Sequence, residues 1–209
     1  MANTDAPFGF KAIGGMGSSY EKQGTSKYEI KDNSTSAIFQ GDLCQFGNSA
    51  STATDANGNT IAVGYISCSS VTEDVLNIGV FNGCFYTDPT TAKPTWKNYY
   101  PGAVNITVGT IDAYVYDNPQ QLFEVQAAGS LAQTDMGNLI DTHTYAAGST
   151  IYGLSNEEVS TAVTGSGATA QWRLIRGSED PANSDKSAAN ANWVVRLNES
   201  IYYAGVVLT

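Results

Sequence analysis

Few residues of this chain could carry out acid–base or nucleophilic chemistry. The only histidine, His143, lies in the polar run Asp141–Tyr145. A single histidine leaves at most one place for a Ser–His or Cys–His pair. The chain also lacks the HExxH, G-x-S-x-G and P-loop patterns. We therefore predict that His143 is a surface or packing residue and that the chain has no catalytic residues.

Carboxylates and thiols give no clearer site. Three adjacent acidic pairs occur, and neighbouring residues of a strand point to opposite faces, which favours solvated charge over an acid/base dyad. The pairs are Glu73-Asp74, Glu157-Glu158 and Glu179-Asp180. A polysaccharide hydrolase that assembles carboxylates from distant strands stays open as an alternative. The widely spaced Cys44, Cys68 and Cys84 indicate free buried thiols without a disulfide, and we predict neither a metal site nor a cofactor.

Aromatic residues are the most promising binding groups. The sequence holds Tyr99-Tyr100, Tyr202-Tyr203 and three tryptophans. Such side chains most often fill β-sheet cores, next most often protein interfaces, and less often stack on sugars. A carbohydrate-binding or fibre-type adhesion module is therefore the alternative to a protein-binding function.

The elements that must position these residues are mostly strands. Apolar alternation and β-branched residues predict strands over 76–81, 84–86, 103–108, 111–116 and 121–126, with Asn82-Gly83 as a hairpin turn. A second hairpin is predicted at Asp55–Asn59. Residues 169–176 and 192–197 each contain a tryptophan, with apolar residues on one face and an arginine on the other. We expect these two strands to pair antiparallel.

Helical signals are weak. Ser130–Ile140 is the best helix candidate, and Ser155–Val159 could form one helical turn. The fold predicted is mainly β: a small β-barrel or sandwich with an extended N-terminal arm and one or two short helices. The predicted division is a docking arm over residues 1–35, a barrel-like body over 36–126, and a helix with C-terminal strands over 127–209.

The predicted arm alternates glycines with apolar residues, a composition that suits an extended segment docked on another surface. Its candidate partner-binding residues are Pro7, Phe8, Phe10, Ile13 and Tyr20.

Charge limits the partners. The net charge is −10, and only 14% of residues are charged. An acidic surface repels both phosphate backbones and anionic lipids, so neither nucleic acid nor membrane is expected as a partner. The first residues lack a basic and an apolar stretch, which predicts synthesis in the cytoplasm.

Several segments, in order along most of the chain, resemble the capsid decoration (cement) proteins of tailed bacteriophages, especially marine phages. The segments are Ala2–Phe10, Ala37–Leu43, Ile78–Cys84, Tyr116–Gln126 and Trp193–Glu199. The resemblance implies a non-enzymatic virion protein on the capsid exterior that bridges major capsid subunits. We expect its partners to be the major capsid protein and further copies of itself, as a trimer.

Overall fold

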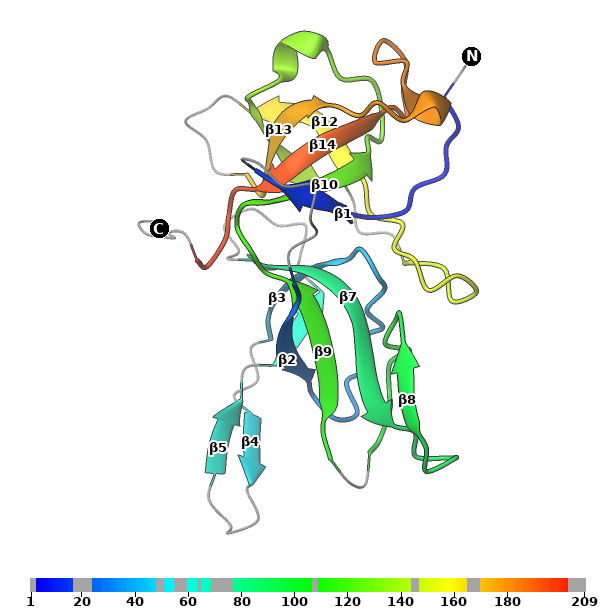
Figure 1. Cartoon of the computed structure of the whole chain (residues 1–209), viewed down its shortest axis with the longest axis vertical. Coiled ribbons are helices and arrows are strands. Elements are labelled where there is room, and N and C mark those ends of the chain that lie inside the picture. The colour runs from blue at the N-terminus through cyan, green and yellow to red at the C-terminus, as the bar shows by residue number, and fades with distance from the viewer. Residues whose placement is uncertain are drawn as a thin grey trace.

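The protein is built from two antiparallel β-sheets, one in each of two lobes (Figure 1). The computed structural model describes residues 3–16, 24–47, 51–54, 60–63, 65–68, 77–106, 109–143, 147–164 and 170–202. We call sheet A with its core lobe A, and sheet B with its core lobe B. The mainly β fold predicted from the sequence is confirmed.

Sheet A curls around the core of lobe A. In spatial order its strands are β1 (Lys11–Gly15), β10 (Gln121–Gln126), β14 (Asn192–Leu197), β13 (Trp172–Gly177), β11 (Leu139–Thr142) and β12 (Val159–Thr164). A bridge between Ala127 and Val159 brings the start of β12 back to the end of β10. The predicted antiparallel pairing of the two tryptophan-bearing strands is confirmed, with Leu174 opposite Val195.

Sheet B also curls, and a bridge between Glu29 and Tyr65 links its two edges. In spatial order its strands are β2 (Ser26–Ile30), β9 (Ile111–Tyr116), β7 (Asn77–Thr87), β3 (Leu43–Phe46) and β6 (Ile66–Cys68), and β8 (Pro94–Lys97) pairs with β7. A separate hairpin is formed by β4 (Ser51–Thr54) and β5 (Thr60–Val63). Its pairing agrees with the hairpin predicted at 55–59, although those five residues lie outside the described part of the chain.

The chain crosses between the sheets twice. Strand β1 belongs to sheet A, β2 to β9 belong to sheet B or to the hairpin, and β10 to β14 return to sheet A. The second crossing follows β9, where Asp117 to Gln120 carry the chain to β10. Lobe A is therefore assembled from both ends of the chain, and the body predicted over 36–126 spans both sheets.

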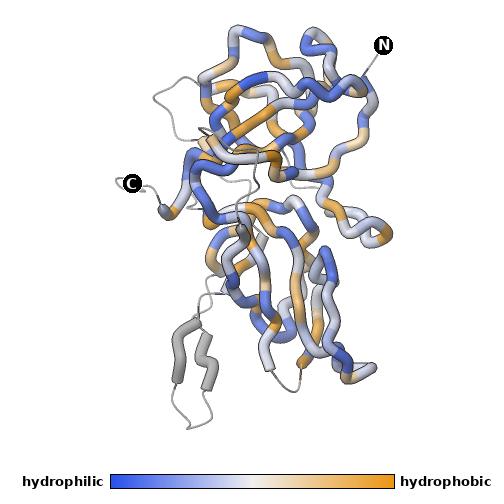
Figure 2. Tube along the Cα trace, in the orientation of Figure 1, coloured by the Kyte–Doolittle hydropathy of each residue, from blue (hydrophilic) through white to orange (hydrophobic). Residues whose placement is uncertain are grey.

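Two apolar clusters fill the lobes, and strands of both sheets are rich in hydrophobic residues (Figure 2). The lobe A cluster contains Phe10, Phe123, Trp172 and Trp193. The lobe B cluster is made mainly of smaller aliphatic residues with Phe81, Tyr86 and Tyr100. Leu43 and Val80 come from sheet B strands but belong to the lobe A cluster, so the two lobes share packed side chains at their junction.

The predicted helices are wrong. Between Ser130 and Ile140 the chain forms one 3-10 turn, η1 (Gln133–Asp135), and then enters β11. Leu139 and Ile140 pair with Arg173 and Trp172, because burial in a sheet outweighs the weak helical preference of this glycine-containing stretch. Residues 155–158 form no helix either, and the other described helical turn is η2 (Pro181–Asn183).

The Asn82-Gly83 hairpin is also wrong. Strand β7 runs through both residues, and a register shift between Phe81 and Gly83 marks a bulge opposite β9. A β-bulge uses the same glycine preference as a tight turn, which explains the error.

The N-terminal segment lies on this chain's own body. Strand β1 pairs with β10, the backbone N–H of Ala6 donates to Gln126 at 3.1 Å, and the side chain of Asn3 donates to two carbonyls of the 185–189 loop. Residues 26–30 then join the other sheet. A single extended arm over residues 1–35 is therefore not found among the described residues.

None of the described helices is long and apolar enough to cross a membrane.

Candidate functional site

A cleft of about 450 Å³ lies where the two lobes meet. Its lining includes residues of β1 and β10 from lobe A, residues of β7 and β9 from lobe B, and residues of the 8–10 and 40–41 segments. Its lining residues are Phe8, Phe10, Lys11, Ala12, Gln40, Gly41, Phe81, Asn82, Tyr116, Glu124, Leu154 and Asp180. The cleft combines aromatic surface with a few polar groups, as binding sites commonly do.

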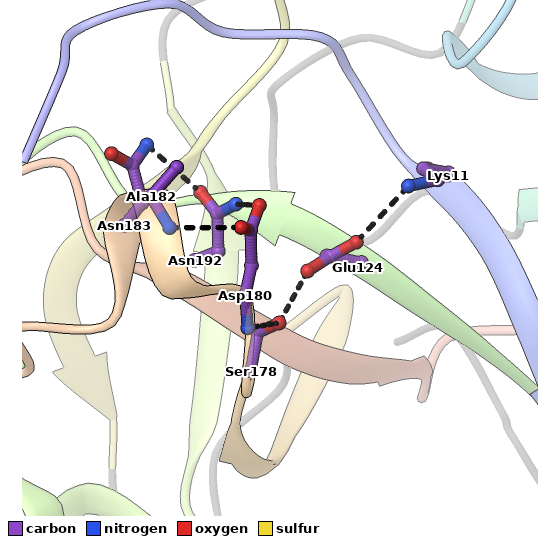
Figure 3. A network of polar contacts seen from close by, with 7 residues as sticks. All are labelled: Lys11, Glu124, Ser178, Asp180, Ala182, Asn183 and Asn192. Carbon is purple, nitrogen blue, oxygen red and sulfur yellow. Dashed lines mark hydrogen bonds and ion pairs between the residues drawn. The ribbon is translucent and has the colours of Figure 1, made fainter.

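A hydrogen-bonded network forms the polar wall (Figure 3). Lys11 Nζ lies 3.4 Å from Glu124 Oε2, and the Ser178 hydroxyl donates to the other oxygen of Glu124. These bonds join β1, β10 and the loop after β13.

The same wall continues through Asp180 (Figure 3). Asp180 Oδ1 accepts from the backbone N–H of Ala182 at 3.0 Å and so caps η2, while Oδ2 accepts from Asn192 Nδ2 at 3.2 Å. Both cleft carboxylates, Glu124 and Asp180, thus hold strands and turns together. That use favours a site that binds over one that transfers protons.

Beside the cleft, residues 149–154 form a projecting loop, here called the tip loop. Ile151 and Tyr152 at its end are 85% and 72% exposed. Together they give the end of the loop a small exposed apolar surface.

The tip loop is held in shape by backbone hydrogen bonds. The N–H of Ser149 donates to the carbonyl of Leu154 at 2.8 Å, and the N–H of Gly153 donates to the carbonyl of Ser149 at 2.7 Å. Gly153 has a φ of +70°, and a Cβ there would stand 2.3 Å from the Asn98 side chain. The positive φ favours glycine at this position.

Lobe B anchors the tip loop. Asn98 Nδ2 donates to the carbonyl of Tyr152 at 2.8 Å, and the N–H of Gln40 donates to the carbonyl of Gly153 at 3.0 Å. Leu154 at the base of the loop also lines the cleft. The exposed tip and the cleft therefore form one continuous region.

Two buried carboxyl groups lie at the same junction. Asp42 and Glu157 are both fully buried. Asp42 Oδ2 accepts from the N–H of Phe39 at 2.7 Å, and Glu157 Oε2 accepts from the N–H of Leu43 at 3.0 Å. Burial, and then the nearby charge of Asp42, raise the pKa of Glu157 well above its usual value. Because Glu157 is buried, the interpretation of Glu157-Glu158 as solvated charge is wrong for Glu157.

The predicted partner-binding residues are only partly brought together. Phe8 lines the cleft and is half-buried, as are Pro7 and Ile13. Phe10 is 2% exposed and stacks on Trp172 with ring centroids 4.0 Å apart, so its ring belongs to this chain's own core and is corrected from a docking residue to a core residue. Tyr20 lies outside the described residues.

The other candidate residues are spread over the molecule. His143 is exposed, and Trp172, Trp193 and Tyr100 are buried in the cores. Cys44 and Cys84 are buried free thiols, and burial raises the pKa of Cys84 to about 12. Within the described ranges, no group of three or more His, Cys, Asp or Glu side chains could hold a metal ion.

The tip loop and the buried pair of Asp42 and Glu157 were not predicted from the sequence. Ile151 and Tyr152 occur in a short run without strand or helix periodicity, and Asp42 follows Gly41 in what reads as a turn. No spacing rule connects Asp42 with Glu157, because 114 residues separate them and the two lobes must meet first.

Comparison with protein-family models, curated proteins and solved structures finds no match to this chain.

Proposed function

We propose that this chain is a structural virion protein that binds the outer surface of a phage capsid and stabilises contacts between major capsid subunits. In this proposal it has no enzymatic activity, and its working surface is the tip loop together with the interlobe cleft. The segments that resemble decoration proteins are the reason for proposing a phage capsid as the partner. The geometry of the tip loop and the cleft is the reason for proposing how the chain binds.

The observation that carries the proposal is the exposed pair Ile151 and Tyr152 on a preformed loop. A projecting apolar pair fits a pocket on another protein, and burying it there contributes through the hydrophobic effect. Because the loop is already ordered, little conformational entropy is lost on binding.

The cleft offers a second contact surface next to the tip loop. Phe8, Tyr116 and Leu154 offer apolar surface that an extended segment or a side chain of the capsid subunit can cover. Contacts at two places on one molecule let it span a seam between subunits and so raise the cost of their separation.

Charge supports a place on the exterior. A chain with a net charge of −10 is repelled by densely packed DNA inside a head. A trimer is the assembly we propose, because closed cyclic symmetry is common and capsid lattices offer threefold positions.

Binding to capsids tests the proposal. Heads assembled from the major capsid protein of the same genome would be mixed with the purified full chain, and occupancy would be measured after sedimentation. We expect the wild type to saturate the heads and Ile151→Asp to lose most of its occupancy, because a charge would have to be buried at the contact.

A matched control places the same charge elsewhere. Met136, at the end of η1, is an exposed apolar residue outside the cleft, and Met136→Asp should bind like the wild type. Absence of wild-type binding would contradict the function, whereas equal binding of Ile151→Asp would contradict the role of the tip loop.

A further inference from the structure

A second surface lies on the outward face of sheet B, away from its core. Cross-strand registers place Trp96 opposite Phe85, Phe85 opposite Asp112, and Asp112 opposite Glu29. Residues that face each other across neighbouring strands point to the same side of a sheet. One row across four strands thus presents two aromatic rings followed by two carboxyl groups.

The neighbouring row extends this surface. Gly83 lies opposite Tyr114, and Tyr114 lies opposite Lys27. The other side of these strands is the buried core, where Cys84 and Ala113 pair. Phe85, Trp96 and Tyr114 together are called the aromatic platform.

Gly83 lets the Trp96 ring pack closely against strand β7. A Cβ at Gly83 would stand 2.6 Å from the indole ring of Trp96, so that ring lies directly over the glycine. It also contacts Tyr114, with ring centroids 5.2 Å apart. Trp96 is 51% exposed and Phe85 is 39% exposed, so this surface keeps two large aromatic side chains in water.

Polar groups border the aromatic platform on one side. Lys27 Nζ lies 2.8 Å from Asp112 Oδ2, and the Thr110 hydroxyl donates to Asp112 Oδ1 at 2.7 Å. Glu29 stands beside Asp112 on the next strand, and burial followed by the charge of Asp112 raises the pKa of its carboxyl group. The border therefore offers carboxylate acceptors and one ammonium donor at fixed positions.

This combination of groups selects a class of ligand. The apolar face of a pyranose ring packs on aromatic rings, while its hydroxyl groups donate to carboxylates and accept from an ammonium group. Anionic ligands are repelled by Glu29 and by the net charge of −10. We propose that the aromatic platform, bordered by Lys27, Glu29 and Asp112, binds a pyranose unit of a neutral oligosaccharide. This site lies outside the tip loop and the cleft, so it does not rest on the proposed function.

Titration calorimetry with the full chain tests the proposal. The probes are cellohexaose, chitohexaose and mannohexaose, with oligogalacturonate as the anionic comparison. We expect at least one neutral oligosaccharide to bind, and Trp96→Ala to weaken that binding by about tenfold or more, because a stacked ring is removed.

The control is Phe46→Ala. Phe46 is an exposed aromatic residue of sheet B that contacts Tyr28 rather than the aromatic platform, so its removal should leave sugar binding unchanged. Failure of all three neutral probes to bind the wild type would overturn the proposal, as would equal binding by Trp96→Ala or tighter binding of oligogalacturonate.

Capsid occupancy of the same variant separates this site from a protein contact. We expect Trp96→Ala to occupy capsids like the wild type. If it instead loses occupancy and the wild type binds no sugar, the aromatic platform is a protein interface and the glycan proposal is wrong.

Discussion

Lobe A buries two tryptophans, Trp172 and Trp193, whereas the tryptophan of lobe B, Trp96, is half exposed. The buried pair packs among strands drawn from both ends of the chain, with Phe10 stacked on Trp172. Trp96 lies on a sheet whose core is already filled by smaller residues on the opposite face. The contrast shows how the same residue type holds one lobe together and leaves the other with a surface available for binding.

The lobes also differ in what lies beside their carboxylates. In lobe A the carboxylates of Glu124 and Asp180 bind neighbouring strands and turns. In lobe B, Asp112 likewise pairs with Lys27 on the next strand, but it lies beside exposed aromatic rings. Lobe A is thus expected to respond to substitution mainly through stability, and the outward face of lobe B mainly through binding.

The largest effect is expected for Phe10→Ala. Removing a fully buried ring that stacks on Trp172 should lower the free energy of unfolding by about 3–5 kcal/mol. The matched aromatic truncation in lobe B, Trp96→Ala, should lower it by about 1 kcal/mol or less, since its ring is already half in water. Urea denaturation followed by circular dichroism measures both, and equal losses would remove the distinction between the lobes.

An intermediate effect is expected at the junction of the lobes, for Glu157→Gln. The folded-state pKa of Glu157 is raised, so its contribution to stability is full below the unfolded pKa of about 4.3 and is lost as pH rises through the folded value. Gln cannot ionise, so the variant should escape this loss. Its stability relative to the wild type should then grow with rising pH, by at most about 1.4 kcal/mol per pH unit.

Unfolding free energies measured from pH 4 upward in urea would check this slope. Glu179→Gln is the control, because it makes the same substitution at an exposed position. Identical slopes for Glu157→Gln and the wild type would mean that the buried pair does not take up a proton on folding.

The smallest effect is expected for Lys11→Met. The ion pair with Glu124 spans 3.4 Å, and the Lys11 side chain is 62% exposed, so solvent and salt screen it. We expect a loss of about 1 kcal/mol or less, shrinking further at high salt. Chemical denaturation at low and high sodium chloride measures it, and a loss as large as that of Phe10→Ala would make the polar wall, rather than the aromatic core, the main support of lobe A.

Strands could be predicted where the pattern of apolar and polar residues lies within a single strand. Ile111–Tyr116 alternates buried and half-buried residues, whereas every residue of Asn192–Leu197 except Arg196 is buried, and both segments were predicted as strands. Sheet membership was not predictable in this way: β9 and β10 are four residues apart, yet they lie in different sheets. The helix expected over 130–140 failed because Leu139 and Ile140 find partners on β13, and local propensity carries no information about those partners.

The residues of the candidate site also differ in whether the sequence could predict them. Phe8 was identified because aromatic residues between glycines stand out in a sequence. The tip loop and the aromatic platform depend on exposure and on cross-strand register, which exist only after the lobes have folded. In the sequence, Trp96 looks equivalent to Trp172 and Trp193. The structure distinguishes them, because Trp96 is half exposed and the other two are buried.

The most direct test of the proposal that this chain is a capsid-binding structural protein is a reconstruction of phage particles produced from the genome that encodes it. The account predicts density for the two-lobed chain on the outside of the head, in threefold clusters, with Ile151 and Tyr152 in contact with a major capsid subunit. Density inside the shell, in the tail, or nowhere on the head would contradict it.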